Sequence, residues 1–336
     1  MILGRRRKGA EGARGRERGV SMIEMIVSMA LLTVVSLIMY EVYVGTMRAG
    51  EFLESHGDLA RMGQVALNQV KAQILQGRFA FQNDTLGTSY LGALTLSRAA
   101  LADGRLPTVD PNGVVAQDDG TTHRTGNAFF FARQIDPIMV TANGKQLIAD
   151  RLVFTYIYLA PAGGDRLLGA DRIDMLEAVS APYADADQLA GYGSDQAAVA
   201  QALYNAGVQK AWKVGQPLSQ AFFNINVSTG SLGSAVTSPT ISMTAQTLLK
   251  GLNSGKVSGK MAYSVAMNTP PGPISETVGV FAYPDSSHPR FPGGFEVQCV
   301  GPSGGRKVVM RLVLLGNYGK KINAQVNFVT AAANQM

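Results

Sequence analysis

The chain has 336 residues, of which 46% are hydrophobic and 16% are charged, a composition that excludes intrinsic disorder and is typical of a folded protein with a sizeable core. Of its 30 basic and 24 acidic residues, seven basic and two acidic lie before Val20, which leaves a nearly balanced 23 and 22 in the rest. A nucleic-acid-binding surface needs basic residues on the folded domain, so the net charge of +6 does not indicate one. The single cysteine, Cys299, excludes an intrachain disulfide and a zinc site with two thiolates, and its apolar neighbours predict a buried thiol.

An apolar run from Val20 to Tyr40 follows the basic segment, and Glu24 is its one charged residue. As a helix rising about 1.5 Å per residue, this run spans roughly 30 Å, the thickness of a bilayer's hydrocarbon core. Basic residues precede it and acidic residues such as Glu41 follow it, so the positive-inside rule places the N-terminus in the cytoplasm. The run is longer than the apolar region of a secretory signal, and no small-residue cleavage site follows it promptly. We therefore expect a single-pass precursor in the cytoplasmic membrane.

Glu24 is the anomaly in this run. A carboxylate inside an apolar span costs about 2.5–3.5 kcal/mol on insertion scales, so its presence indicates a function. A cut between Gly19 and Val20 would create an α-amino group within one helical turn of Glu24. We expect Glu24 to pair with that amine or with the same group of a neighbouring chain. The alternative is that the carboxylate lies near enough to the cytoplasmic edge to reach water.

Arg18 and Gly19, followed by Val20 to Glu24 and a proline-free apolar helix, resemble the leader of type IV pilins and type II secretion pseudopilins. In that family a prepilin peptidase cuts after the glycine and methylates the new N-terminus, and an acidic residue follows four positions later. The resemblance implies cleavage after Gly19, an N-methylated Val20 and a role in assembly for Glu24. Val20 stands where the family usually has Phe, and Ser21 stands where Thr is common.

The helix is expected to continue beyond the apolar run as an amphipathic one. Apolar residues step by three and four positions, as one face of an α-helix does: Leu59, Met62, Ala66, Val70 and Ile74. Gly57 is the expected interruption and Gly77 the expected stop. This pattern predicts one helix over residues 20–76, whose membrane-spanning half covers residues 20–43.

Beyond Gly77, short β-like runs alternate with Gly, Pro, Asn and Asp. The predicted strands before the C-terminus cover residues 91–96, 128–132 and 152–159. The predicted helices cover residues 194–213 and 240–252. A C-terminal hairpin is expected from residues 307–315 and 322–329, because the second run alternates apolar and polar residues as a half-exposed strand does.

The expected fold class is α+β: a long N-terminal helix, transmembrane and then amphipathic, packed on an antiparallel β-sheet domain, as the pilin resemblance also implies. The expected division is a cleaved basic leader at 1–19, the helix at 20–76, and a globular β-rich domain with helical insertions at 77–336. A weaker likeness of pattern and size over residues 40–76 resembles J-type minor pseudopilins and large minor pilins. The mature chain would be large for a major pilin and lacks the C-terminal cysteine pair of many type IV pilins.

No catalytic or metal-binding pattern stands out. The three histidines are far apart in the sequence, and no Gly-x-Ser-x-Gly signature accompanies them: His56, His123 and His288. The loops 110–113 and 118–120 hold oxygen donors without the EF-hand spacing, so we expect solvated turns there and no metal or other cofactor. An acidic group is expected to face solvent or to pair with Arg166 and Arg172: Asp165, Asp171, Asp174 and Glu177.

The sequence thus predicts a structural rather than an enzymatic protein. Its expected partners are a prepilin peptidase, other pilin or pseudopilin subunits contacted through the helix, and the cytoplasmic membrane. After processing, its expected location is a pilus or pseudopilus, with the C-terminal domain in the periplasm or outside the cell. One alternative is a membrane-tethered exported binding protein that does not assemble. Another is an exported enzyme, which would need a cleft with converging acid and base groups.

Overall fold

The computed structural model describes residues 21–101, 104–112, 125–161, 173–249, 258–261, 263–265, 279–281, 295–318, 321–333 and 336. Two compact units divide the chain, residues 1–53 and residues 54–336. Helix α1, Met22–Ile74, is continuous from the first into the second, so the expected long helix is confirmed and the interruption expected at Gly57 is wrong. A glycine inside a helix costs only about 1 kcal/mol relative to alanine, which the buried contacts of the following turns offset.

The first unit contains the apolar part of α1. This segment is long and apolar enough to cross a membrane, and none of it is buried against the rest of the chain. Its large side chains are therefore exposed, as at Ile23, Leu32 and Met39. Such a surface needs lipid or other apolar helices around it, because a soluble monomer rarely exposes so large an apolar area.

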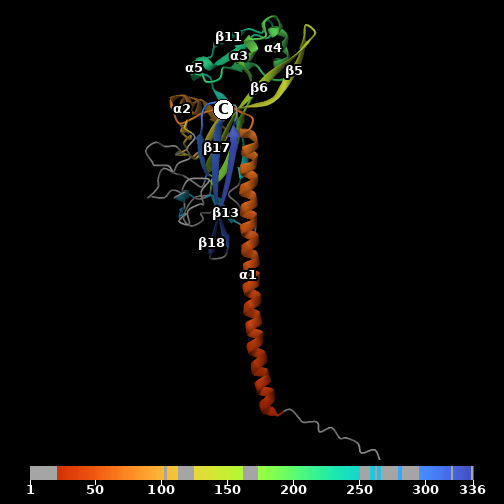
Figure 1. The fold of residues 1–336 in the computed structure, drawn as a ribbon, viewed down its shortest axis with the longest axis vertical. Helices are drawn as coiled ribbons and strands as arrows, with labels where there is room; N and C mark the ends of the chain where they lie inside the picture. Colours follow the sequence, from red (N-terminus) through yellow and green to blue (C-terminus); the bar gives the residue numbers. More distant parts are fainter. Residues whose placement is uncertain are drawn as a thin grey trace, which may run out of the picture. The chain divides into compact units, whose positions relative to one another are not determined.

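The second unit contains a large mixed sheet, here called sheet A, in which most neighbours are antiparallel (Figure 1). Along its main path the strand order is β11-β10-β9-β8-β6-β7-β12-β2, and β5 lies between β6 and β1. Within sheet A, the pairs β8–β9 and β12–β2 are parallel. Its strands are β1 (Gly77–Ala80), β2 (Leu94–Leu96), β5 (Phe129–Ala142), β6 (Lys145–Pro161), β7 (Ile173–Ser180), β8 (Tyr183–Asp185), β9 (Lys210–Trp212), β10 (Phe222–Ile225), β11 (Leu232–Ala235) and β12 (Ile241–Leu249).

A second sheet, here called sheet B, is built around the expected C-terminal hairpin. Strands β17 (Arg306–Tyr318) and β18 (Lys321–Ala333) pair antiparallel over their whole length, which confirms that hairpin. Sheet B also contains β3 (Val109–Asp110), β4 (Thr125–Gly126), β13 (Ser258–Met261) and β16 (Phe295–Val300). A separate pair is formed by β14 (Tyr263–Val265) and β15 (Gly279–Phe281).

Four short helices and one 3-10 turn complete the described part: α2 (Thr85–Gly92), α3 (Ala186–Ala190), η1 (Gly193–Asp195), α4 (Gln196–Asn205) and α5 (Leu218–Ala221). The helix predicted at 194–213 is thus shorter, because Gly207 at φ +82° turns the chain towards β9. The strand predicted at 91–96 is limited to β2, since α2 occupies its beginning.

The helix predicted at 240–252 is wrong, because residues 241–249 form strand β12. Ile241 and Met243 are buried while Ser242 and Thr244 are exposed, which is the two-residue period of a strand. Pairing with β7 on one side and β2 on the other supplies the hydrogen bonds that a helix would otherwise make internally.

The amphipathic half of α1 packs in a core shared with both sheets. Four residues of the predicted stripe are at most 2% exposed and join one apolar cluster with residues of both sheets: Leu59, Ala66, Val70 and Ile74. The fifth, Met62, is partly buried against that cluster, and Leu67, which was not predicted, also belongs to it. Alternate residues of a strand point to opposite faces. Phe129 and Ile157 therefore face α1, whereas the neighbouring Phe130 and Tyr156 join an aromatic cluster on the other face of sheet A.

The β5–β6 hairpin carries a third cluster at its distal end, where α3 and α4 pack on it (Figure 1). Its tip is the two-residue turn Asn143–Gly144, in which both residues have positive φ (47° and 73°), as a type I′ turn requires. The Asn143 amide also donates to the Asp195 carboxylate at the start of α4. The turn and this contact hold α4 beside the hairpin.

Candidate processing and assembly site

The start of α1 is held by a reciprocal pair of hydrogen bonds. The Ser21 N–H donates to Glu24 Oε2 at 2.9 Å, and the Glu24 N–H donates to Ser21 Oγ at 3.2 Å. This is a capping box, in which Ser caps the helix and a Glu three residues later reaches back to the cap residue. Gly19 and Val20, the residues expected to flank the cut, lie outside the described residues.

The capping box gives Glu24 a partner within its own chain. The carboxylate lies in the first turn of α1, where the helix dipole and the free N–H groups favour negative charge. Glu24 Oε1 accepts no hydrogen bond in the described part of the chain and is open to a further donor. Sequence reasoning missed this arrangement, although Ser-x-x-Glu directly before an apolar helix is its signal.

Other polar groups in the first unit are also satisfied locally. The hydroxyls of Thr33 and Thr46 donate to the carbonyls of Met29 and Val42, each at 2.8 Å and four residues back along the helix. Such bonds within the helix remove the penalty of placing a hydroxyl in lipid. The apolar part of α1 is therefore compatible with a hydrocarbon environment.

Cys299 lies on β16 and is 1% exposed, so the predicted buried thiol is confirmed. Burial raises the pKa of this thiol to about 11, and the nearby Arg306 opposes the shift only in part. The thiolate is the reactive form, so native Cys299 is a poor nucleophile near neutral pH.

Native Cys299 is expected to react with a thiol reagent at pH 8 about 100-fold more slowly than in the unfolded chain, because its pKa is raised from 9.0 to about 11. Stopped-flow labelling with and without denaturant measures this difference. The Cys299 thiol ionises at a lower pH in the unfolded chain than in the folded one. Its burial therefore leaves the free energy of unfolding unreduced below about pH 9 and lowers it progressively as the pH rises towards 11. Cys299→Ala should lose less stability over that interval, and equal losses would contradict the assignment.

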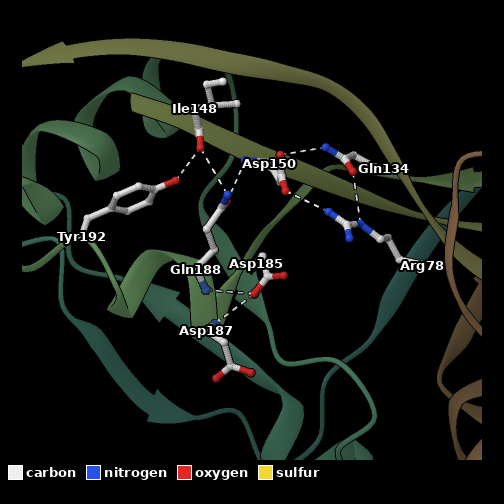
Figure 2. Close-up of polar contacts among 8 residues, drawn as sticks. All are labelled: Arg78, Gln134, Ile148, Asp150, Asp185, Asp187, Gln188 and Tyr192. Atoms are coloured by element: carbon white, nitrogen blue, oxygen red, sulfur yellow. Dashed lines mark hydrogen bonds and ion pairs between the residues drawn. The ribbon is translucent and has the colours of Figure 1, made fainter. Parts of the chain in front are cut away.

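One extended polar cluster fastens the β5–β6 hairpin to β1 and α3 (Figure 2). Arg78 donates to Asp150 and to Gln134, each at 3.1 Å, and Gln134 donates to the other Asp150 oxygen at 2.7 Å. Tyr192 donates to the Ile148 carbonyl at 2.5 Å, and burial raises the pKa of its hydroxyl. Both carboxylate oxygens and the phenol proton are already engaged, so the cluster is suited to holding elements together rather than to acid–base chemistry.

An enzyme would need a cleft with converging reactive groups. A shallow hollow of about 190 Å³ lies between the start of β8, the turn before β9 and the start of β12. Lys210 is the charged residue of its lining, beside hydroxyl and amide groups such as Thr240, Ser242 and Gln209. This lining contains no carboxylate or histidine to pair with Lys210 as an acid–base couple.

No group of three potential metal ligands occurs among the described residues. Asp110 is 8% exposed, and its Oδ1 accepts the Asn112 N–H at 3.0 Å, so it caps its own turn. The loop 118–120, His123 and His288 lie outside the described residues, and His56 lies on α1.

The expectation that the acidic group at 165–177 faces solvent is wrong for its two described members. Asp174 is 7% exposed and forms an ion pair with Arg98 at 2.7 Å. Glu177 is 1% exposed and accepts hydrogen bonds from three glutamines. These partners of Asp174 and Glu177 come from distant parts of the sequence. The other members of the group and the two expected arginines lie outside the described residues: Asp165, Arg166, Asp171 and Arg172.

Comparison with known protein families gives one match: residues 14–40 match the prokaryotic N-terminal methylation motif. No curated protein and no solved structure matches the chain. The matched residues include Gly19, Val20 and the capping box, and they extend along the apolar part of α1. A long apolar helix followed by mostly antiparallel sheets is a pilin-like α+β architecture. The matched motif is that of prepilin cleavage and methylation, so the N-terminal segment of the chain is similar to those of pilins and pseudopilins.

Proposed function

We propose that this protein is a structural subunit of a type IV pilus or type II secretion pseudopilus, cut after Gly19, methylated at Val20 and assembled through α1. The observation that supports it most is the coincidence of the methylation motif with an apolar helix that is unburied within its own chain. Such a helix is stored in the membrane as a precursor and is buried among other helices after assembly.

The proposed division is a leader at 1–19, the helix at 20–76 and a globular domain at 77–336. The leader carries seven basic residues and is discarded by a prepilin peptidase, which leaves a nearly neutral mature chain. The helix contacts other pilin or pseudopilin subunits. A domain of this size suits a minor subunit, because a filament's bulk repeat favours a compact domain.

Mature protein is expected to begin at Val20 and to carry one additional methyl group on its amine. Intact-mass measurement and N-terminal sequencing of the membrane-extracted protein test this. In the matched control, Gly19→Val, a branched side chain stands where the peptidase approaches a residue without a Cβ. That variant should retain Met1 as its first residue. Mature wild-type protein that begins at Met1 would refute the proposal.

A membrane-tethered binding protein that never assembles is the second candidate. The capping box favours it, because Ser21 already supplies Glu24 with a hydrogen-bond partner without any neighbouring chain. This candidate keeps the same anchor but needs no cleavage. An uncut chain that remains monomeric in the membrane would support it.

A further inference from the structure

Glu177 on β7 is a buried carboxylate held mainly by amide groups. Three side-chain amides donate to it: Gln69 at 3.2 Å, Gln73 at 2.6 Å and Gln246 at 2.8 Å. It forms no ion pair within 4 Å in the described part of the chain, although the Arg133 charge is near enough to interact with it. A buried charge of this kind is stable only while its donors stay in place.

Two of the three donors come from α1. Gln69 and Gln73 are one helical turn apart, and Gln76, two residues after the end of the helix, accepts from Arg133 Nη1 at 3.1 Å. Arg133 Nε also donates to Thr155 Oγ1 on β6 at 3.1 Å. The side-chain amides at the end of α1 therefore contact Glu177 and Arg133 on sheet A, beside the apolar cluster.

The two kinds of contact constrain the helix differently. Apolar packing around Val70 and Ile74 is non-directional, so a helix shifted by one turn would still find apolar neighbours. A shift of one turn, about 5.4 Å, would bring one of the two α1 amides to the place of the other and carry the second away, so the buried carboxylate would lose one of its three donors. The polar contacts therefore add a directional preference for one axial position, beside the two-residue connection that joins α1 to β1.

We propose that Glu177, with Gln69 and Gln73, is a register clamp that fixes the axial position of α1 against the globular unit. This inference rests on the proposed function in one respect: a subunit assembled through α1 carries its globular unit on that helix, so the axial position of α1 sets where the globular unit is held. Buried polar groups serve a register role in other helical proteins, at some expense of stability.

Disulfide trapping in purified mature protein in detergent tests the clamp, in a Cys299→Ala background. A disulfide between Gly63→Cys and Asn327→Cys indicates the native axial position of α1, because a Cβ built on Gly63 would lie 2.6 Å from Asn327 Cγ. Cysteines at Ala60 or Ala66, paired with Asn327→Cys, report shifts of about one turn in either direction. Disulfide geometry tolerates much less than such a shift.

The native pair is expected to form almost alone when Glu177 is present. In Glu177→Leu, the ratio of native to shifted disulfides should fall at least tenfold. Asp187→Leu is the matched control, since that carboxylate is 66% exposed and pairs with Lys213 away from α1, and it should keep the native ratio. An unchanged ratio in Glu177→Leu would overturn the clamp.

If Glu177→Leu does not fold, the triple variant Gln69→Leu, Gln73→Leu and Glu177→Leu replaces the polar contacts with an apolar surface, an exchange that often preserves stability. It should fold, as judged by circular dichroism, and show mixed disulfides. Failure of both variants to fold would show that Glu177 acts in stability rather than register, which also overturns the proposal. The measurement needs no filament, so its failure is separate from a failure of the proposed function.

Discussion

Replacing Glu24 with alanine is expected to leave cleavage after Gly19 intact and to reduce incorporation into filaments at least tenfold. The new amine of Val20 would enter an apolar helix bundle without its partner, and breaking a buried charge pair costs about 3–5 kcal/mol. Each 1.4 kcal/mol corresponds to a factor of ten in an equilibrium. The measurement is the fraction of processed subunit recovered with sheared filaments rather than with the membrane.

Glu24→Gln separates the two roles that the structure allows for Glu24. A glutamine can still accept the Ser21 N–H bond, so the capping box is preserved while the charge is removed. If charge pairing drives assembly, Glu24→Gln should behave like Glu24→Ala. Wild-type incorporation of Glu24→Gln would instead assign Glu24 to capping and would reject the pairing with the amine.

Replacing Trp212 with alanine is expected to lower the free energy of unfolding by about 3–5 kcal/mol, the range for removing a large buried aromatic side chain. Trp212 on β9 is fully buried, and its ring meets Phe154 edge-to-face with centroids 4.8 Å apart. Its Nε1–H donates to Tyr90 Oη at 3.0 Å, and Tyr90 in turn donates to the Gln216 carbonyl. The substitution therefore opens a cavity and removes one bond from a buried chain of hydrogen bonds.

Urea unfolding of the mature protein in detergent, followed by circular dichroism, measures this loss. Fluorescence is unsuitable because Trp212 is the single tryptophan of the chain. Tyr204→Ala on α4 is the matched control, since that ring is 47% exposed and its removal should change stability by less than about 1 kcal/mol. Equal losses in the two variants would show that the aromatic cluster does not stabilise sheet A.

Features that depend on neighbouring residues were predictable from the sequence. The apolar helix, its one-sided continuation from Leu59 to Ile74 and the C-terminal hairpin each follow from a period of 3.6 or 2 that a short window contains. The burial of Cys299 follows from its apolar neighbours in the same strand. The capping box was equally local, and only its four-residue signature had to be noticed.

Contacts between residues far apart in the sequence decided the features that local patterns did not predict correctly. Residues 241–249 form a strand because β7 and β2 supply hydrogen-bond partners from elsewhere in the chain. Glu177 is buried because Gln69 and Gln73 approach from more than 100 positions earlier, whereas its sequence neighbours indicated a solvated acidic group. A few neighbouring residues determine the helical or strand period that a segment favours and which of its faces is apolar. Which charge can be buried depends on donors that only the folded chain brings together.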